Sequence, residues 1–148
     1  MNPAGWPHEE IRSVALRYIR EHAMQESQWR FTVLDAMAQR LARIVRLETT
    51  ERAIVTCFID AQRWYVMTSS RIFGVLQGSK FNCSPLDVTQ WRWGDFKHAG
   101  RSEIETATLA LTNGTHLRLP YETGPAAMGP MYYERFWTTK YPVLEKLE

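Results

Sequence analysis

The sequence predicts an α+β fold, in which an N-terminal helical hairpin precedes a strongly bent antiparallel sheet, or open barrel, of about seven strands, capped by a C-terminal helix. Apolar residues recur at helical spacing through residues 1–47. Short β-rich segments joined by tight turns follow from Arg52 to Tyr121, and the aromatic segment Met131–Tyr141 comes last. We place the hairpin at residues 1–47 and the sheet with its terminal helix at 48–148, together forming one compact unit.

The hairpin prediction depends on two amphipathic segments. Pro7 begins a helix that we expect to reach about Met24, because proline and acidic residues favour a first helical turn. A polar break follows, in which Ser27 can cap a second helix. The second stripe consists of Phe31, Leu34, Ala38, Leu41 and Val45. Because the connection between the two segments is short, they are expected to pack as antiparallel neighbours.

Short β-rich segments make up the middle of the chain. The expected strands are Ala53–Asp60, Arg63–Ser69, Arg71–Leu76, a short Lys80–Cys83, and Val88–Phe96. In the last of these, Trp91 and Trp93 share a face that Arg92 does not. This alternation favours core tryptophans over a surface on which nucleic-acid bases stack, and no nucleic-acid partner is expected.

The hairpin Thr108–Leu119 allows two registers. A two-residue turn at Asn113-Gly114 mixes apolar and polar side chains on each face. A three-residue loop, Thr112-Asn113-Gly114, pairs Leu109 with Leu117 and places all four leucines on one face. Because a slip of one residue exchanges the two faces, burial favours the second register, with Gly114 in the left-handed conformation.

An aromatic helix is expected at the C-terminal end. Gly129-Pro130 suits its first turn, and Pro142 is expected to end or kink it. The residues spaced to form one broad face are Tyr133, Phe136, Trp137 and Tyr141.

Composition narrows the class of protein. The chain carries 18 Lys and Arg against 16 Asp and Glu, so its net charge of +2 gives weak long-range attraction to polyanions. Cys57 and Cys83 lie in predicted strands, where cysteine is usually a small buried residue, and they lack the spacing of a metal site. No signal-like or membrane-spanning apolar run is visible. We therefore expect a cytoplasmic protein.

Three sequence features resemble the bacterial pleckstrin-homology-like (PH/GRAM-type) family. They are the segment Trp64–Ile72, whose Thr68-Ser69-Ser70-Arg71 is similar to the family's T-x-x-R turn between strands, the late hairpin Leu109–Leu119, and the closing helix with Trp137. The resemblance implies a bent sheet capped by that helix and a protein that binds lipids, peptides or other proteins rather than a catalyst. Residues 1–46 lie outside the part of the chain that resembles the family. Lipid-binding members carry clustered Lys and Arg near the first turn, whereas this chain has Asp60-Ala61-Gln62 there. The resemblance therefore does not lead us to expect inositol-lipid binding by this chain.

The sequence contains few features that are typical of an enzyme. The chain lacks the usual nucleophile, metalloprotease, phosphate-loop and dinucleotide motifs, so no catalytic residue, metal or cofactor is expected. His98, in a loop near Asp95, is the nearest approach to a general base.

The leading hypothesis is a non-enzymatic binding or scaffolding module that recognises a protein partner through aromatic and arginine anchors. A toxin-neutralising, immunity-type role and a homodimer through the helical hairpin are extensions of it. The candidate binding residues are Arg40, Arg43, Arg63, Arg92 and His98. One alternative is binding to lipid or a membrane surface. A second is a small-ligand-binding or enzymatic protein with a cone-shaped α+β fold.

Overall fold

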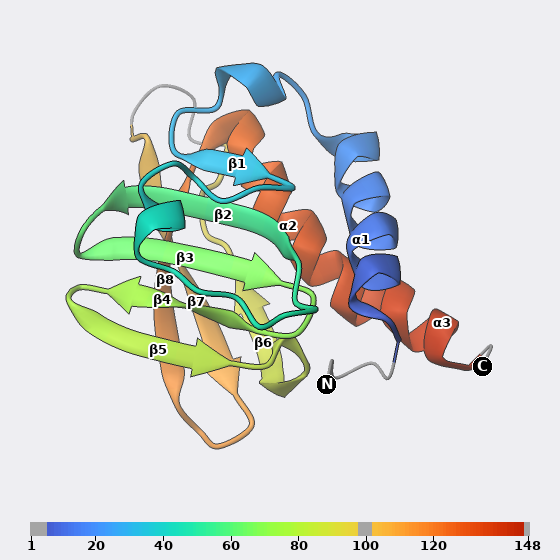
Figure 1. The fold of residues 1–148 in the computed structure, drawn as a ribbon. Coiled ribbons are helices and arrows are strands. Elements are labelled where there is room, and N and C mark those ends of the chain that lie inside the picture. The colour runs from blue at the N-terminus through green and yellow to red at the C-terminus, as the bar shows by residue number, and fades with distance from the viewer. Residues whose placement is uncertain (1–5, 98–101, 147–148) are drawn as a thin grey trace.

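The computed structural model of the chain describes residues 6–97 and 102–146, which contain eight strands in two antiparallel sheets. The first sheet has the order β1 (Thr32–Leu34), β2 (Ala53–Asp60), β3 (Arg63–Thr68), β4 (Ile72–Leu76) and β5 (Ser79–Cys83). The second has the order β6 (Val88–Arg92), β7 (Ile104–Leu111) and β8 (His116–Glu122). Figure 1 shows the second sheet behind the first, with its strands running across those of the first.

The predicted antiparallel strands are confirmed, but the two sheets remain separate. Within the described residues no hydrogen-bonded ladder closes them into a barrel. One corner is instead joined by a side chain. The carboxylate of Glu122, at the end of β8, accepts hydrogen bonds from the backbone amides of Arg30 (2.7 Å) and Phe31 (2.8 Å) and from the hydroxyl of Thr32 (2.7 Å). A buried acidic side chain therefore links β8 to the start of β1.

The helices lie on one flank of the sheets. Helix α1 (His8–His22) packs beside α2 (Met128–Arg135), as Figure 1 shows. A π-helical turn (Phe136–Lys140) and α3 (Tyr141–Lys146) continue the C-terminal helix. Single 3₁₀ turns occur at Glu26–Gln28, Leu41–Arg43, Pro85–Asp87 and Gly124–Ala127.

The aromatic face predicted for the terminal helix is buried in the main core. Tyr133 and Phe136 are fully buried, and Trp137 is 2% exposed. The Tyr133 hydroxyl donates to the carbonyl of Thr68 (2.7 Å), which fixes the helix against the end of β3. Pro142 does not end the helix. Since proline has no N–H to donate, the widened turn just before it lets the chain continue helically.

The second helix of the predicted N-terminal hairpin is not formed. Two 3₁₀ turns and the short strand β1 occupy residues 26–47 instead. The apolar positions of the predicted stripe are buried or partly buried, but on two sides of the first sheet. Phe31 and Leu34 contact the main core, while Ala38, Leu41 and Val45 belong to a second cluster on the outer face. The prediction was wrong because the chain crosses the edge of the sheet and buries apolar residues first on one face and then on the other. Together these residues have the same spacing as one face of a helix.

Asp35 marks the crossing point. Its backbone is left-handed (φ 63°), which interrupts the strand. Its carboxylate accepts two hydrogen bonds from the Arg12 guanidinium of α1, at 2.6 and 2.7 Å. Residues 35–52, here called the connector, then run over the outer face of the first sheet. There the Thr56 hydroxyl accepts from the Ala38 amide (3.0 Å) and donates to the Ala36 carbonyl (2.9 Å).

The late hairpin has the register that leucine burial predicts. Leu109 pairs with Leu117, and the Leu111 amide donates to the Thr115 carbonyl (2.8 Å). Gly114 has φ +88° and its amide donates to the Leu111 carbonyl (3.0 Å), as a type I turn followed by a left-handed residue requires. Burial of the leucine face therefore selects the three-residue loop over Asn113-Gly114 alone.

Strand β6 ends at Arg92 rather than at the predicted Phe96, and the tryptophans in it and just after it pack in the main core. Trp93 is 8% exposed and its ring meets Tyr121 edge-on, with the centroids 5.2 Å apart. Trp91 is partly buried and stacks on Trp93. A register shift between Val88 and Gln90 allows Val88 to be buried as well, although simple alternation places it on the opposite face from the tryptophans.

Strands β3 and β4 approach closely at Gly74. A Cβ atom there would lie 2.1 Å from the Trp64 carbonyl oxygen and 2.8 Å from the Tyr65 Cα. We expect Gly74→Ala to lower the free energy of unfolding by about 3 kcal/mol, because the backbone itself must move. Urea denaturation measures this. The control is Gly129→Ala in α2, where the added methyl meets side chains at 3.4 Å or more. Equal stability of the two variants would contradict the close approach.

Candidate functional site

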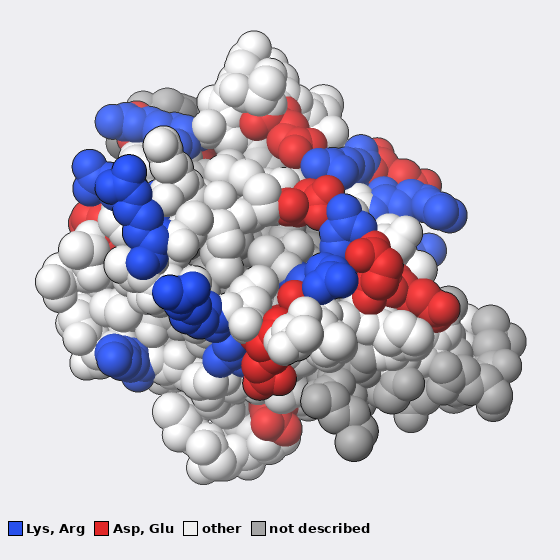
Figure 2. Space-filling model, viewed as in Figure 1, with Lys and Arg blue, Asp and Glu red and all other residues white. Residues whose placement is uncertain are grey.

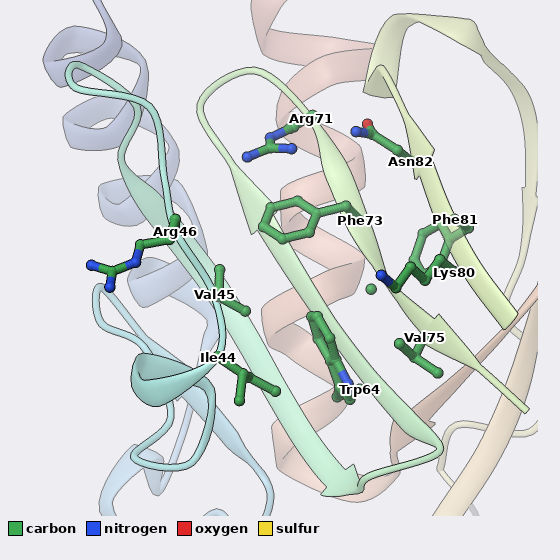
Figure 3. Close-up of a pocket in the computed structure, with 11 residues that line it drawn as sticks. Ile44, Val45, Arg46, Trp64, Arg71, Phe73, Val75, Lys80, Phe81 and Asn82 are labelled. Carbon is green, nitrogen blue, oxygen red and sulfur yellow. The ribbon is translucent and has the colours of Figure 1, made fainter. Parts of the chain in front are cut away.

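An open hollow lies on the outer face of the first sheet, beside the connector. It encloses a volume of about 450 Å³ and is called the outer cleft here. Its lining comes from residues 44–46 of the connector, Trp64 of β3, Arg71 and residues 73–75 at β4, and residues 80–82 of β5. Figure 3 shows the connector residues on one side, the β5 residues on the other, and Trp64 and Phe73 between them.

Strand alternation builds the floor of the outer cleft. Tyr65 and Ile72 point into the main core, so Trp64 and Phe73 point the other way. Their rings meet edge-on with the centroids 6.3 Å apart. Val75 pairs with Trp64 in register and extends the apolar surface toward β5. The connector covers β2 and the near part of β3, and the floor is the part of this face that it leaves open.

Positive charge surrounds this apolar floor. Arg46, Arg71 and Lys80 line the outer cleft, and none of the described lining residues is acidic. This bias is local, since the whole chain has nearly balanced charge. Figure 2 shows an uncharged, hollowed centre on this face, with mainly positive side chains along its left margin and mixed charges along its right. Such a surface attracts anionic groups that carry an apolar portion.

A buried carboxylate holds Arg71 in place. The Glu51 side chain is fully buried and accepts from Arg71 Nε (2.8 Å) and Nη2 (3.1 Å). It also accepts from the Thr68 hydroxyl (2.6 Å) and the Glu48 amide (3.1 Å). Burial alone would raise the pKa of Glu51, but these hydrogen bonds outweigh burial, so the pKa lies below its ordinary value. We refer to Glu51, Thr68 and Arg71 as the Glu51 cluster.

The Glu51 cluster leaves part of Arg71 available at the cleft. The guanidinium lies 4.0 Å from the centroid of the Phe73 ring, and the side chain is 24% exposed. Its Nη1 makes no hydrogen bond to any residue that the structure describes. The paired Glu51 therefore fixes the position of the arginine over the aromatic floor without occupying all of its donors.

The turn between β3 and β4, residues 68–71, is also tied to α1. The Thr68 hydroxyl accepts from the amides of Ser70 (3.1 Å) and Arg71 (3.0 Å). Ser69 is fully buried, and its hydroxyl shares a hydrogen bond with Nδ1 of His8 and accepts from the Arg52 amide. Burial lowers the pKa of His8, which favours the neutral ring. The hydrogen bond between buried His8 and Ser69 links the start of α1 to this turn.

The residues that the sequence singled out do not gather at the outer cleft. Arg40 and Arg43 lie exposed on the connector, with Arg40 over the Phe58 ring (5.7 Å). Arg63 pairs with Asp60 at the β2–β3 turn (2.8 Å). Arg92 is exposed on β6, where it lines a separate hollow of about 110 Å³ together with His116. His98 lies outside the described residues.

The cleft residues had weaker sequence signals. Trp64 and Arg71 both lie in the segment that resembles the pleckstrin-homology-like family, and Lys80 begins a strand that was predicted. Alternation alone places Trp64 and Val66 on the same face of β3. Only the path of the connector shows that Val66 is covered while Trp64 borders an open space.

The described part of the chain contains neither a cluster of metal ligands nor a reactive cysteine. No group of three or more His, Cys, Asp or Glu side chains there could hold a metal ion. Burial raises the pKa of the Cys57 thiol to about 12 and that of Cys83 to about 11, so neither is an activated nucleophile. None of the described helices has the length and apolar character needed to cross a bilayer.

Comparisons with protein-family models, curated proteins and solved structures find no match to this chain.

The Glu51 cluster predicts a pH-dependent stability. Glu51→Gln should lower the free energy of unfolding by about 3 kcal/mol at neutral pH, because one partner of a buried ion pair is lost. The folded-state pKa of Glu51 is depressed below 4.5, so its contribution is complete above pH 4.5 and is lost as pH falls through the folded-state value. Urea titrations across this range should show the two proteins converging in acid.

The matched control for this test is Glu48→Gln, which alters an exposed carboxylate three residues earlier. It should change stability by less than about 0.5 kcal/mol. A constant difference between Glu51→Gln and the unaltered protein from pH 7 into acid would show that the Glu51 charge does not stabilise the fold.

Proposed function

We propose that this protein is a non-enzymatic binding module whose outer cleft takes an acidic segment of a partner protein that carries an aromatic or aliphatic anchor. The observation that carries the proposal is an open apolar floor bordered by Arg46, Arg71 and Lys80, with no carboxylate among the described lining residues. An acidic segment complements the charge, while its anchor removes Trp64 and Phe73 from water.

The layout of the cleft favours a polypeptide over a compact metabolite. The three cations come from separate elements, namely the connector, the turn before β4, and β5. The floor between them is open to solvent and is formed by side chains of two neighbouring strands. A chain with acidic groups on both sides of an apolar residue can meet these separated charges together. Tryptophan and arginine are also the residue types that contribute most at protein interfaces.

The proposed class is a pleckstrin-homology-like module. Support comes from the meander β2–β5, the three-stranded sheet β6–β8 that crosses it, and the terminal helix whose aromatic face enters the core. Helix α1 and the connector are additions to that plan, and the connector forms one wall of the outer cleft. In this proposal the extra N-terminal segment shapes the binding surface.

The binding proposal is tested with a fluorescein-labelled peptide that contains Glu-Glu-Phe-Glu-Glu. Arg46→Glu and Lys80→Glu should each weaken its binding about fivefold, since reversing an exposed charge removes one attraction and adds one repulsion. Fluorescence anisotropy at low and moderate salt measures the dissociation constant, which should rise with salt. The matched control is Arg43→Glu, which makes the same exchange on the connector but outside the cleft.

Two altered peptides separate the contributions of charge and apolar contact. Replacing the four Glu by Ser, or the Phe by Ser, should each weaken binding. Equal effects of Arg43→Glu and Arg46→Glu would show attraction to general positive charge and contradict the cleft as the site. Binding of anionic vesicles but not the peptide, with the same dependence on Lys80, would assign the cleft to a membrane surface instead.

A further inference from the structure

The outer edge of β5 is a free strand edge. Strand β5 ends the first sheet and pairs only with β4 among the described strands. The Thr68 amide donates to the Arg71 carbonyl, so the backbone groups of Arg71 face β3. Backbone N–H and C=O groups point to alternate sides along a strand, so those of Phe73 and Val75 also face β3. The groups of the intervening β4 residues, Ile72 and Gly74, then face β5.

The same alternation determines which backbone N–H and C=O groups of β5 remain unpaired. Phe81 and Cys83 lie opposite Gly74 and Ile72 and bond β4. The backbone N–H and C=O groups of Lys80 and Asn82 must therefore point away from the sheet. Both residues are exposed, and outside the β4–β5 ladder no described residue makes a backbone hydrogen bond to them. An edge of this kind can accept another strand.

Two hollows meet at this edge. The outer cleft lies on the outer face, and a second hollow of about 230 Å³, called the edge hollow, lies between β5 and the start of β8. Lys80 and Phe81 line both of them. The edge hollow adds His116 and Arg118, and its described lining also contains no carboxylate. Positive charge is therefore present on both sides of the β5 edge.

We infer that the acidic segment binds as an extended strand added to the free edge of β5, an inference that rests on the proposed function. Successive side chains of an added strand point to opposite faces, so its acidic residues meet Lys80 on one side and Arg118 on the other. Asn82 is short, and its β4 partner is Phe73. A large apolar side chain opposite Asn82 can thus lie over it toward the aromatic floor.

The charge at this edge also selects the occupant. A lysine on an edge strand discourages pairing with neutral strands and with a second copy of the same edge, whose own Lys80 would bring like charge to the contact. An acidic strand turns that repulsion into attraction. The edge is therefore specific for an acidic partner strand rather than for self-association.

The experiment compares Asn82→Pro with Asn82→Ala, using the same labelled Glu-Glu-Phe-Glu-Glu peptide. Both variants lack the amide side chain, but only proline removes the outward N–H, and proline is tolerated where that group faces solvent. Asn82→Pro should bind about five- to tenfold more weakly than Asn82→Ala, because one backbone hydrogen bond is lost. Urea denaturation confirms that both variants remain folded.

A second measurement needs no substitution in the protein. N-methylation of each peptide amide in turn should weaken binding at alternate positions only, since alternate N–H groups face β5. Amide hydrogen exchange at Lys80 and Asn82 should slow on binding, while Phe81, already paired with Gly74, changes little.

The outcomes separate the two levels of inference. If the peptide binds and depends on Arg46 and Lys80, yet Asn82→Pro equals Asn82→Ala and methylation shows no alternation, strand addition is overturned and the proposed function stands. If the unmodified peptide does not bind at all, the proposed function is overturned together with the strand model.

Discussion

The buried carboxylate of Glu51 is the interaction on which the outer face of the molecule depends. Removing a charge from water is costly, and only multiple hydrogen bonds offset that cost. Arg71, Thr68 and the Glu48 amide supply them. The carboxylate thereby fixes the end of the connector to the β3–β4 turn. It also presents Arg71 at the outer cleft, so that one cluster links the path of the chain to the shape of the candidate site.

A second buried acid, Glu122, has an equivalent role at the opposite corner. It satisfies the amides that precede β1 and ties them to the end of β8. Backbone pairing alone would leave those donors without partners, because the two sheets do not share a ladder at this corner. Both corners are therefore held by side-chain carboxylates. The connector between them is drawn across the first sheet, with Asp35 and Arg12 holding its crossing point.

This arrangement gives the first sheet two buried faces of unequal extent. The inner face packs on the main core over its whole width, whereas the connector covers only part of the outer face. The uncovered remainder leaves the aromatic side chains of Trp64 and Phe73 only partly buried. The proposed binding function depends on this apolar surface beside arginine and lysine. The free edge of β5 borders the same region, which brings backbone and side-chain contacts within reach of one bound segment.

Local sequence patterns were enough to predict those parts of the fold that depend on a single element. β-Rich segments and the tight turns between them located the strands from β2 to β8. Leucine burial chose the register of the late hairpin, and aromatic spacing identified the buried face of the terminal helix. Each of these follows from which side chains must leave water along a single element. Tertiary structure decided the rest. The stripe from Phe31 to Val45 has helical spacing, yet it divides between two cores because the chain crosses a sheet edge. The site likewise depends on which part of a face another segment covers and on which buried acid holds an arginine, and both are contacts between residues far apart in the chain.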